Sequence, residues 1–159
     1  MSAIGVAVYA IDLATKTWAA RVLADDPVAL LPWLRLTEVR NPGAAFGLAD
    51  GATVVLTGLA LAAVLLVLVV TNRARRTVVL VVLGLVLGGA LGNVSDRVFR
   101  SPGLGRGWVV DWISVGWWPV FNLADVSVVT AACLTAASAA VRTTRSSSGT
   151  GHARDGAAG

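Results

Sequence analysis

The stretch TVVLVVLGLVLGGALGNVS, residues 77–95, contains no charged side chain. A second uncharged run of similar length, ATVVLTGLALAAVLLVLVV, covers residues 52–70. About twenty apolar residues in a helix cross roughly 30 Å of hydrocarbon, and a helix satisfies its own backbone hydrogen bonds there. Both runs therefore predict membrane-spanning helices.

The composition of the whole chain agrees with a membrane protein. Of its 159 residues, 56% are hydrophobic and 14% are charged, and the mean hydropathy is +0.76, which is outside the usual range of soluble domains. Two further runs, residues 1–20 and 119–141, have spanning length although they contain acids. The first is not a cleavable signal peptide, because it lacks a basic start and carries an acid in its apolar centre. We therefore predict an all-α membrane protein with four transmembrane helices and both termini on one side.

Charge and composition in the connecting segments predict the orientation. The short connection TNRARR, residues 71–76, contains three arginines, so its side is expected to be cytoplasmic. The longer segments, about 21–51 and 99–118, then lie outside the cell. Within the first of them LRLTEVR, residues 34–40, alternates apolar and polar residues as a short strand does. This pattern predicts a small extracytoplasmic β-sheet.

The chain is expected to form one domain over residues 1–141 with a disordered cytoplasmic tail over residues 142–159, because the tail is rich in Gly, Ser, Ala and Arg. Its single histidine, His152, lies in that tail, and its single cysteine, Cys133, is expected to be buried in the last helix. No set of metal ligands results, so we expect neither a metal nor a cofactor. The net charge is +4, and the basic residues are expected to contact lipid head groups or to set the orientation in the membrane. Nucleic acid is excluded as a partner.

Two other patterns predict packing. Gly84, Gly88 and Gly92 recur every fourth residue and should let another helix approach closely along one face. All six tryptophans fall in or beside the outer segments, at positions 18, 33, 108, 112, 117 and 118. They are interpreted as a belt at the membrane surface, or as bulky residues that pack the loops.

A charge in the middle of a bilayer costs about 2.5 to 3.5 kcal/mol, so each polar residue in these helices needs a partner or a purpose. Asp12 and Lys16 are one helical turn apart and form either a structural pair or a substrate-positioning group. Asn93, Asp96 and Arg97 share a helical face. Asp96 and Arg97 are expected to neutralise each other, while Asn93 offers donors inward.

Asp125 is an acid for which these pairings provide no basic partner. It lies roughly 9 Å into the last helix if that helix starts at Pro119, and Asn122 falls on the same face. Asp111, in the strand-like VVDWI, is the nearby acid that could lie beside it. Two carboxyl groups in a low dielectric share one proton and then act as acid and base together, as in aspartic proteases. The alternative is two independently solvated loop acids.

Five ordered blocks resemble the lipoprotein signal peptidases, or signal peptidase II, a family of bacterial membrane aspartic proteases. These blocks are DLATK, NPGAAFG, GGALGNVSDRV, VVDWI and FNLAD. The resemblance implies that Asp111 and Asp125 are the catalytic pair. It also implies a substrate-binding or site-shaping role for one further set of residues: Asn41, Gly43, Asn93, Asp96, Arg97 and Asn122. Asp12 and Lys16 match the D-x-x-T-K pattern and are assigned a structural role.

The resemblance also implies an activity. Members of this family remove the signal peptide from diacylglyceryl-modified prolipoproteins by cutting before the lipidated cysteine, and they are inhibited by globomycin. It implies four helices, a small outer sheet and a loop over the active site near the extracytoplasmic face. The expected location is the bacterial inner membrane, with prolipoproteins and membrane lipids as partners and a monomeric protein.

Other functions remain open on the sequence. A small proton-coupled transporter could relay protons through Asp12, Asp96 and Asp125, although there is no internal repeat and the acids gather toward one surface. A peptidase with a serine activated by Lys16 is a second alternative. A purely structural helix bundle would leave Asp125 unexplained.

Overall fold

The structure is a computed structural model that describes residues 2–43, 52–71 and 76–151. These residues form four helices and three strands, which confirms the expected mixture of helices and a small sheet. Their bounds are α1 Ser2–Val22, β1 Val28–Leu31, β2 Leu34–Asn41, α2 Ala52–Thr71, α3 Thr77–Phe99, β3 Val109–Val115 and α4 Leu123–Gly151.

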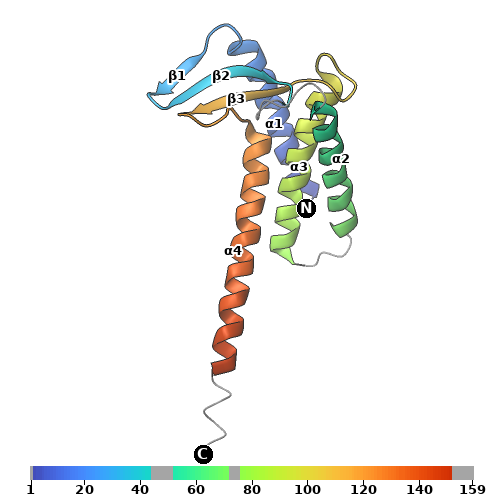
Figure 1. Cartoon of the computed structure of the whole chain (residues 1–159), viewed down its shortest axis with the longest axis vertical. Helices are drawn as coiled ribbons and strands as arrows, with labels where there is room; N and C mark the ends of the chain where they lie inside the picture. The colour runs from blue at the N-terminus through green and yellow to red at the C-terminus, as the bar shows by residue number, and fades with distance from the viewer. Residues whose placement is uncertain (1, 44–51, 72–75, 152–159) are drawn as a thin grey trace, which may run out of the picture.

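The helices and the sheet occupy different ends of the molecule. The sheet lies at the end of the bundle where α1 ends and α4 begins, whereas α1 begins and α4 ends away from it (Figure 1). α3 packs against each of the other three helices. The centre of the described structure is therefore α3, and its end nearest the sheet is where segments far apart in the sequence meet.

The glycine face of α3 allows this close packing. A Cβ atom added to Gly88 would lie 2.6 Å from both the carbonyl oxygen of Gly5 and the Cβ of Val8, on α1. A Cβ on Gly92 would collide with the carboxylate of Asp12, also on α1. The predicted close approach is confirmed, with α1 as the partner helix.

Membrane-spanning character is clearest in two helices. Among the described residues, Thr77–Phe99 and Leu123–Ala140 are long and apolar enough to cross a bilayer. In α2 the shorter apolar stretch is Thr57–Val67, and large side chains such as Leu59 and Leu65 are exposed. Exposed leucines of this kind suit contact with lipid.

The sheet is antiparallel, with the strand order β1-β2-β3. In the register of β2 and β3, Val39 lies opposite Asp111 and Arg40 lies opposite Val110. The strand predicted at residues 34–40 is confirmed as β2, and VVDWI lies in β3. β1 was not predicted, because all four residues of VALL are apolar and therefore lack the alternation of apolar and polar residues that marks a strand.

The prediction for the start of the last helix is wrong. α4 begins at Leu123, not at Pro119, because the chain before it is extended: Phe121 exchanges backbone hydrogen bonds of 2.9 and 3.0 Å with Ile113 of β3. Asp125 therefore lies in the first turn of α4, at the end of the helix next to the sheet.

Other expectations are modified or lie outside the described residues. α4 continues to Gly151, so the first part of the expected disordered tail is helical, and residues 152–159 lie outside the described part. Residues 72–75 of the arginine-rich connection and residues 44–51 of the first outer segment also lie outside it. Cys133 is exposed and does not pack inside the bundle as expected.

Candidate active site

Asp111 points from β3 into the protein and is 3% exposed. Its two carboxylate oxygens accept hydrogen bonds from side-chain amides: Oδ1 from Asn122 at 2.6 Å and Oδ2 from Asn41 at 2.8 Å. Burial raises the pKa of Asp111 to about 6, and the negative charge of Asp125 acts in the same direction. The amide donors of Asn41 and Asn122 and the charge of Lys16 oppose this increase of the pKa.

Asp125 and Asn122 bind each other at the start of α4. The Asp125 backbone N–H donates to Oδ1 of Asn122 at 3.1 Å, and the Asn122 N–H donates to Oδ2 of Asp125 at 3.1 Å. This reciprocal pair is a capping box, which satisfies two backbone donors at a helix N-terminus. Asn122 therefore contacts both carboxyl groups: its side-chain amide nitrogen donates to Asp111, and its backbone N–H donates to Asp125.

Asn93 of α3 joins this pair from the other side. Its Nδ2 donates to Oδ1 of Asp125 at 3.0 Å, as expected of a donor that points inward. Its Oδ1 accepts hydrogen bonds from Lys16 Nζ at 2.8 Å and from Asn122 Nδ2 at 3.3 Å. These two donors fix the orientation of the Asn93 amide, so that its nitrogen faces the carboxylate.

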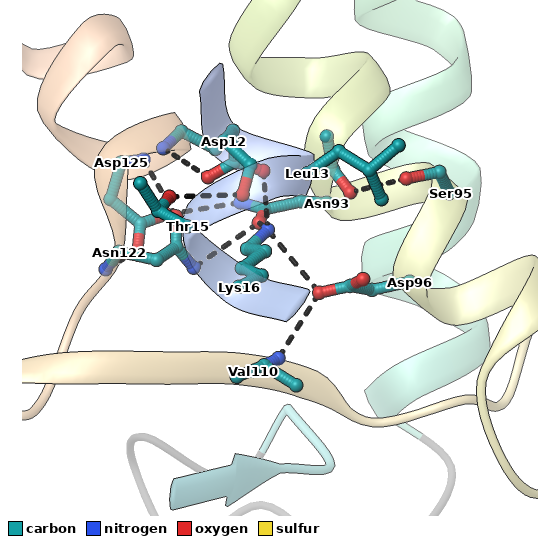
Figure 2. Close-up of polar contacts among 12 residues, drawn as sticks. Asp12, Leu13, Thr15, Lys16, Asn93, Ser95, Asp96, Val110, Asn122 and Asp125 are labelled. Carbon is teal, nitrogen blue, oxygen red and sulfur yellow. Dashed lines mark hydrogen bonds and ion pairs between the residues drawn. The ribbon is translucent and has the colours of Figure 1, made fainter. Parts of the chain in front are cut away.

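Asp12 and Lys16 form the predicted pair on α1 and also make contacts beyond it (Figure 2). Lys16 Nζ lies 2.8 Å from Asp12 Oδ2 and 3.3 Å from Asp96 Oδ2, and both Asp12 and Lys16 are fully buried. Asp12 Oδ1 accepts the backbone N–H of Ala124 at 2.9 Å. Because Ala124 is in the first turn of α4, this carboxylate lies at the positive end of the helix dipole.

The direct ion pair of Asp96 on α3 is not with Arg97, although the charge of Asp96 acts on the Arg97 guanidinium. Asp96 pairs with Arg100, one helical turn later, and accepts the backbone N–H of Val110 at 3.1 Å. Arg97 donates to the carbonyl of Asn93 at 3.3 Å, and its buried Nε has no hydrogen-bond partner among the described residues. The charges of Asp111 and Asp125 both act on the Arg97 guanidinium, so Arg97 lies within electrostatic reach of the acid pair.

Asn41 and Gly43 form a tight turn at the end of β2. The Gly43 N–H donates to Oδ1 of Asn41 at 2.8 Å, and Gly43 has a φ of 98°, which favours glycine. Since the amide oxygen of Asn41 is held by this turn, its nitrogen faces Asp111. All eight predicted site-shaping and catalytic residues thus lie around one region, between β3, the end of α3 and the start of α4.

The sequence did not reveal several groups in this region. Arg100 could have been found, because its spacing of four from Asp96 is that of a helical ion pair. The backbone donors of Val110 and Ala124 carry no sequence signal. Neither does the space beside Gly92 that admits the Asp12 carboxylate.

The charges of this region balance if the acids hold one proton. Among the described residues it contains four carboxyl groups and three cationic groups, namely Asp12, Asp96, Asp111 and Asp125 with Lys16, Arg97 and Arg100. Burying an uncompensated charge is costly. The arrangement therefore favours one proton on the acids, and burial makes Asp111 take up a proton more readily than an ordinary carboxyl group does, with a pKa of about 6. In the part of the chain that the structure describes, no group of three His, Cys, Asp or Glu could hold a metal ion.

Residues 4–141 match the family profile described as signal peptidase (SPase) II. The chain belongs to the signal peptidase II family. Two similar relatives are named lipoprotein signal peptidase. The one from Rhodococcus jostii is 50% identical over 129 residues, which cover 80% of this chain and 65% of the relative. The one from Mycobacterium avium is 48% identical over 129 residues, which cover 80% of this chain and 71% of the relative. The chain thus spans less than two thirds of the Rhodococcus jostii relative.

Two solved structures share the fold, and both are described as bacterial membrane enzymes. One has a TM-score of 0.72 at 29% identity and covers 85% of this chain and 88% of that chain. The other has a TM-score of 0.75 at 28% identity, and the match covers 89% of this chain and 88% of that chain. Together with the apolar helices, these similarities identify a membrane protein of the signal peptidase II family.

Proposed function

We propose that this protein is an aspartic endopeptidase that removes the signal peptide from diacylglyceryl-modified prolipoproteins and cuts on the N-terminal side of the lipidated cysteine. The relatives named lipoprotein signal peptidase support this activity. The structural observation that carries the proposal is the contact of Asn122 with both Asp111 and Asp125. One residue thereby donates to both carboxyl groups, through its side-chain amide to Asp111 and through its backbone N–H to Asp125, in a family whose members are proteases.

In the proposed mechanism the two acids share one proton, held by Asp111, while Asp125 is ionised. Asp125 takes a proton from a water molecule as that water attacks the scissile carbonyl, and Asp111 donates a hydrogen bond to the carbonyl oxygen. The tetrahedral intermediate then breaks, and its leaving nitrogen receives a proton from the pair. Asn93 and Asn122 orient Asp125, and Asn41 and Asn122 orient Asp111. The positive charge of Arg97 is placed to stabilise the negative charge that develops.

We further propose that all four helices span the bacterial cytoplasmic membrane, with both termini inside and the sheet outside. The position of the sheet at one end of the bundle supports this topology (Figure 1). Residues 1–141 then form one membrane domain followed by a cytoplasmic tail, an extracytoplasmic loop covers the site, and the protein acts as a monomer. In this topology Asp111 and Asp125 lie at the level of the outer head groups. The acyl chains of a prolipoprotein would stay in the lipid while its scissile bond reaches the acids.

A cleavage assay tests the activity. Purified protein is incubated with a diacylated prolipoprotein, with and without globomycin. Asp111→Asn and Asp125→Asn should each lower the rate at least about a thousandfold, because each removes one acid of the pair. Asp26→Asn is the matched control, since Asp26 is an exposed acid outside the site. Normal turnover by either site variant would rule out the assignment of the pair.

A labelling experiment tests the topology. In a Cys133→Ser background, single cysteines at Asp26 and at Arg76 place a thiol at each end of the bundle. A membrane-impermeant thiol reagent added to intact cells should modify the cysteine at position 26 and spare the one at position 76. The reverse pattern would overturn the proposed orientation.

The transporter alternative gains no support from the geometry. Asp12 and Asp96, two of its three relay acids, are both ion-paired with Lys16. A carboxylate fixed in an ion pair is a poor proton carrier.

A further inference from the structure

A cavity lies on the face of the sheet opposite the Asp111 side chain. Successive residues of a strand point to opposite faces. Val39 and Asp111 therefore lie on one face of the sheet, and Arg40 and Val110 lie on the other. Arg40 and Val110 line a cavity of about 280 Å³ at the junction of the sheet with the ends of α1 and α3. No residue of the proposed acid pair lines it.

Two arginines give this cavity its chemistry. Arg40 Nε lies 2.8 Å from Glu38 Oε1, and Arg100 Nε pairs with Asp96. Neither guanidinium makes another hydrogen bond to the described residues, so both retain Nη donors. The fork of a guanidinium matches the oxygens of a phosphate.

The acid in the cavity lies deeper than the cation. The side chain of Glu38 is 9% exposed, whereas that of Arg40 is 57% exposed. An approaching ligand therefore meets the guanidinium first, with the carboxylate beneath it. Ser101 also lines the cavity, and a serine hydroxyl can donate a hydrogen bond.

Aromatic side chains border the same cavity at the end of a candidate membrane span. Phe99 is the last residue of α3, is 83% exposed and lines the cavity together with Trp108. Exposed aromatic residues beside arginines at the end of a span are typical of the head-group region of a bilayer. A free anion in water would gain nothing from these aromatic side chains, whereas a lipid would place its glycerol and upper acyl chains against them.

We propose that this cavity binds the phosphate head group of an anionic glycerophospholipid of the outer leaflet. Arg40 and Arg100 donate to the phosphate, Ser101 adds a hydroxyl donor, and Phe99 and Trp108 contact the glycerol and acyl region. The proposal does not require the peptidase activity, but its outer leaflet rests on the orientation given under the proposed function, and Arg100 also pairs with Asp96 of the candidate active site.

Native mass spectrometry of the full chain in neutral detergent tests this binding. Phosphatidylglycerol and phosphatidylcholine are titrated in parallel, and the bound fraction is measured for each. Phosphatidylglycerol should bind with the higher affinity. Arg40→Gln should weaken its binding about tenfold, because one charge-assisted contact is lost. Arg35→Gln is the matched control, since Arg35 is exposed on the same strand and does not line the cavity.

A second variant should change the affinity for phosphatidylglycerol in the opposite direction. Glu38→Gln removes the acid beneath Arg40 and should tighten the binding of phosphatidylglycerol. Thermal unfolding of each variant establishes that the fold is retained. Arg100 is left unchanged, because it also holds Asp96.

Three results would overturn the proposal. They are equal affinity for the two lipids, equal weakening by Arg40→Gln and Arg35→Gln, and looser binding of phosphatidylglycerol by Glu38→Gln. Inorganic phosphate at millimolar concentration is the final arm. If it displaces phosphatidylglycerol completely, the site recognises a free anion and the assignment to a lipid is wrong.

Discussion

The side-chain amide of Asn122 donates a 2.6 Å hydrogen bond to Oδ1 of Asp111. Because Asn122 also caps α4, the same residue fixes the first turn of the helix that carries Asp125. Asn122 therefore links the two acids, while Asn41 holds Asp111 and Asn93 holds Asp125 from their other sides.

Replacing Asn122 separates its two tasks. Asn122→Ala removes the helix cap and the bond to Asp111, and should lower the free energy of unfolding by about 1 to 2 kcal/mol while activity is lost. Asn122→Ser keeps a capping oxygen but is too short to reach Asp111. We expect Asn122→Ser to regain most of the stability without the activity, as measured by thermal unfolding and prolipoprotein cleavage. Full activity in Asn122→Ser would show that the contact with Asp111 is dispensable.

The raised pKa of Asp111 predicts how stability depends on pH. Its pKa is raised from the ordinary value of 3.8 to about 6, so the folded state holds this proton more tightly than the unfolded state. The resulting stability is fully present below about pH 4 and is lost as the pH rises through about 6. Relative to Asp111→Asn, the wild-type free energy of unfolding should fall by about 3 kcal/mol across this window. Parallel pH curves for the two proteins in detergent would contradict this prediction.

Gly92 is expected to tolerate no side chain. A methyl group there would collide with the Asp12 carboxylate, so Gly92→Ala should destabilise the protein by about 1 to 3 kcal/mol. Gly58→Ala in α2 is the matched control, because a Cβ at Gly58 meets nothing within 4 Å. In a helix interior that exchange should be neutral or stabilise by up to about 1 kcal/mol. Chemical denaturation in detergent measures both, and equal effects at the two positions would refute the collision.

Lys16 is expected to be more important for stability than its single charge suggests. Lys16→Met leaves Asp12 and Asp96 without their shared cation, and breaking a buried pair in this way costs about 3 to 5 kcal/mol. Asp96 still has Arg100 as a partner, so Asp12 is the acid left without a cation. The double variant Asp12→Asn with Lys16→Met removes that charge while keeping an oxygen that can accept the Ala124 N–H. It should be more stable than Lys16→Met alone. If the double variant is the less stable protein, the charge of Asp12 is not what Lys16 compensates.

Much of the fold could be predicted because membrane helices depend on one simple property. The uncharged runs at residues 52–70 and 77–95 had to be helical to satisfy their backbones, and α2 and α3 contain them. The start of α4 was misplaced because Pro119 to Phe121 are as apolar as the helix that follows. Hydrophobicity alone does not distinguish an extended segment paired with Ile113 from a first helical turn, although the N-x-x-D spacing of the cap was present.

The candidate site could be assembled from the sequence as a set of residues but not as a set of contacts. Spacing on α1 predicted the pair of Asp12 and Lys16, since both are on one helix. Spacing could not predict that Lys16 also binds Asn93 and Asp96, because these contacts depend on how α1 packs against α3. For the same reason Asp96 was paired with its sequence neighbour, when it in fact binds Arg100.

The bond between Asp12 and the first turn of α4 has a consequence for biosynthesis. A nascent chain that has inserted only its first three helices already carries Asp12, Asn93 and Asp111. It lacks Asn122 and Asp125, and its α1 carboxylate has no helix end to bind. Under the proposed mechanism, hydrolysis can therefore begin only after the final helix has docked.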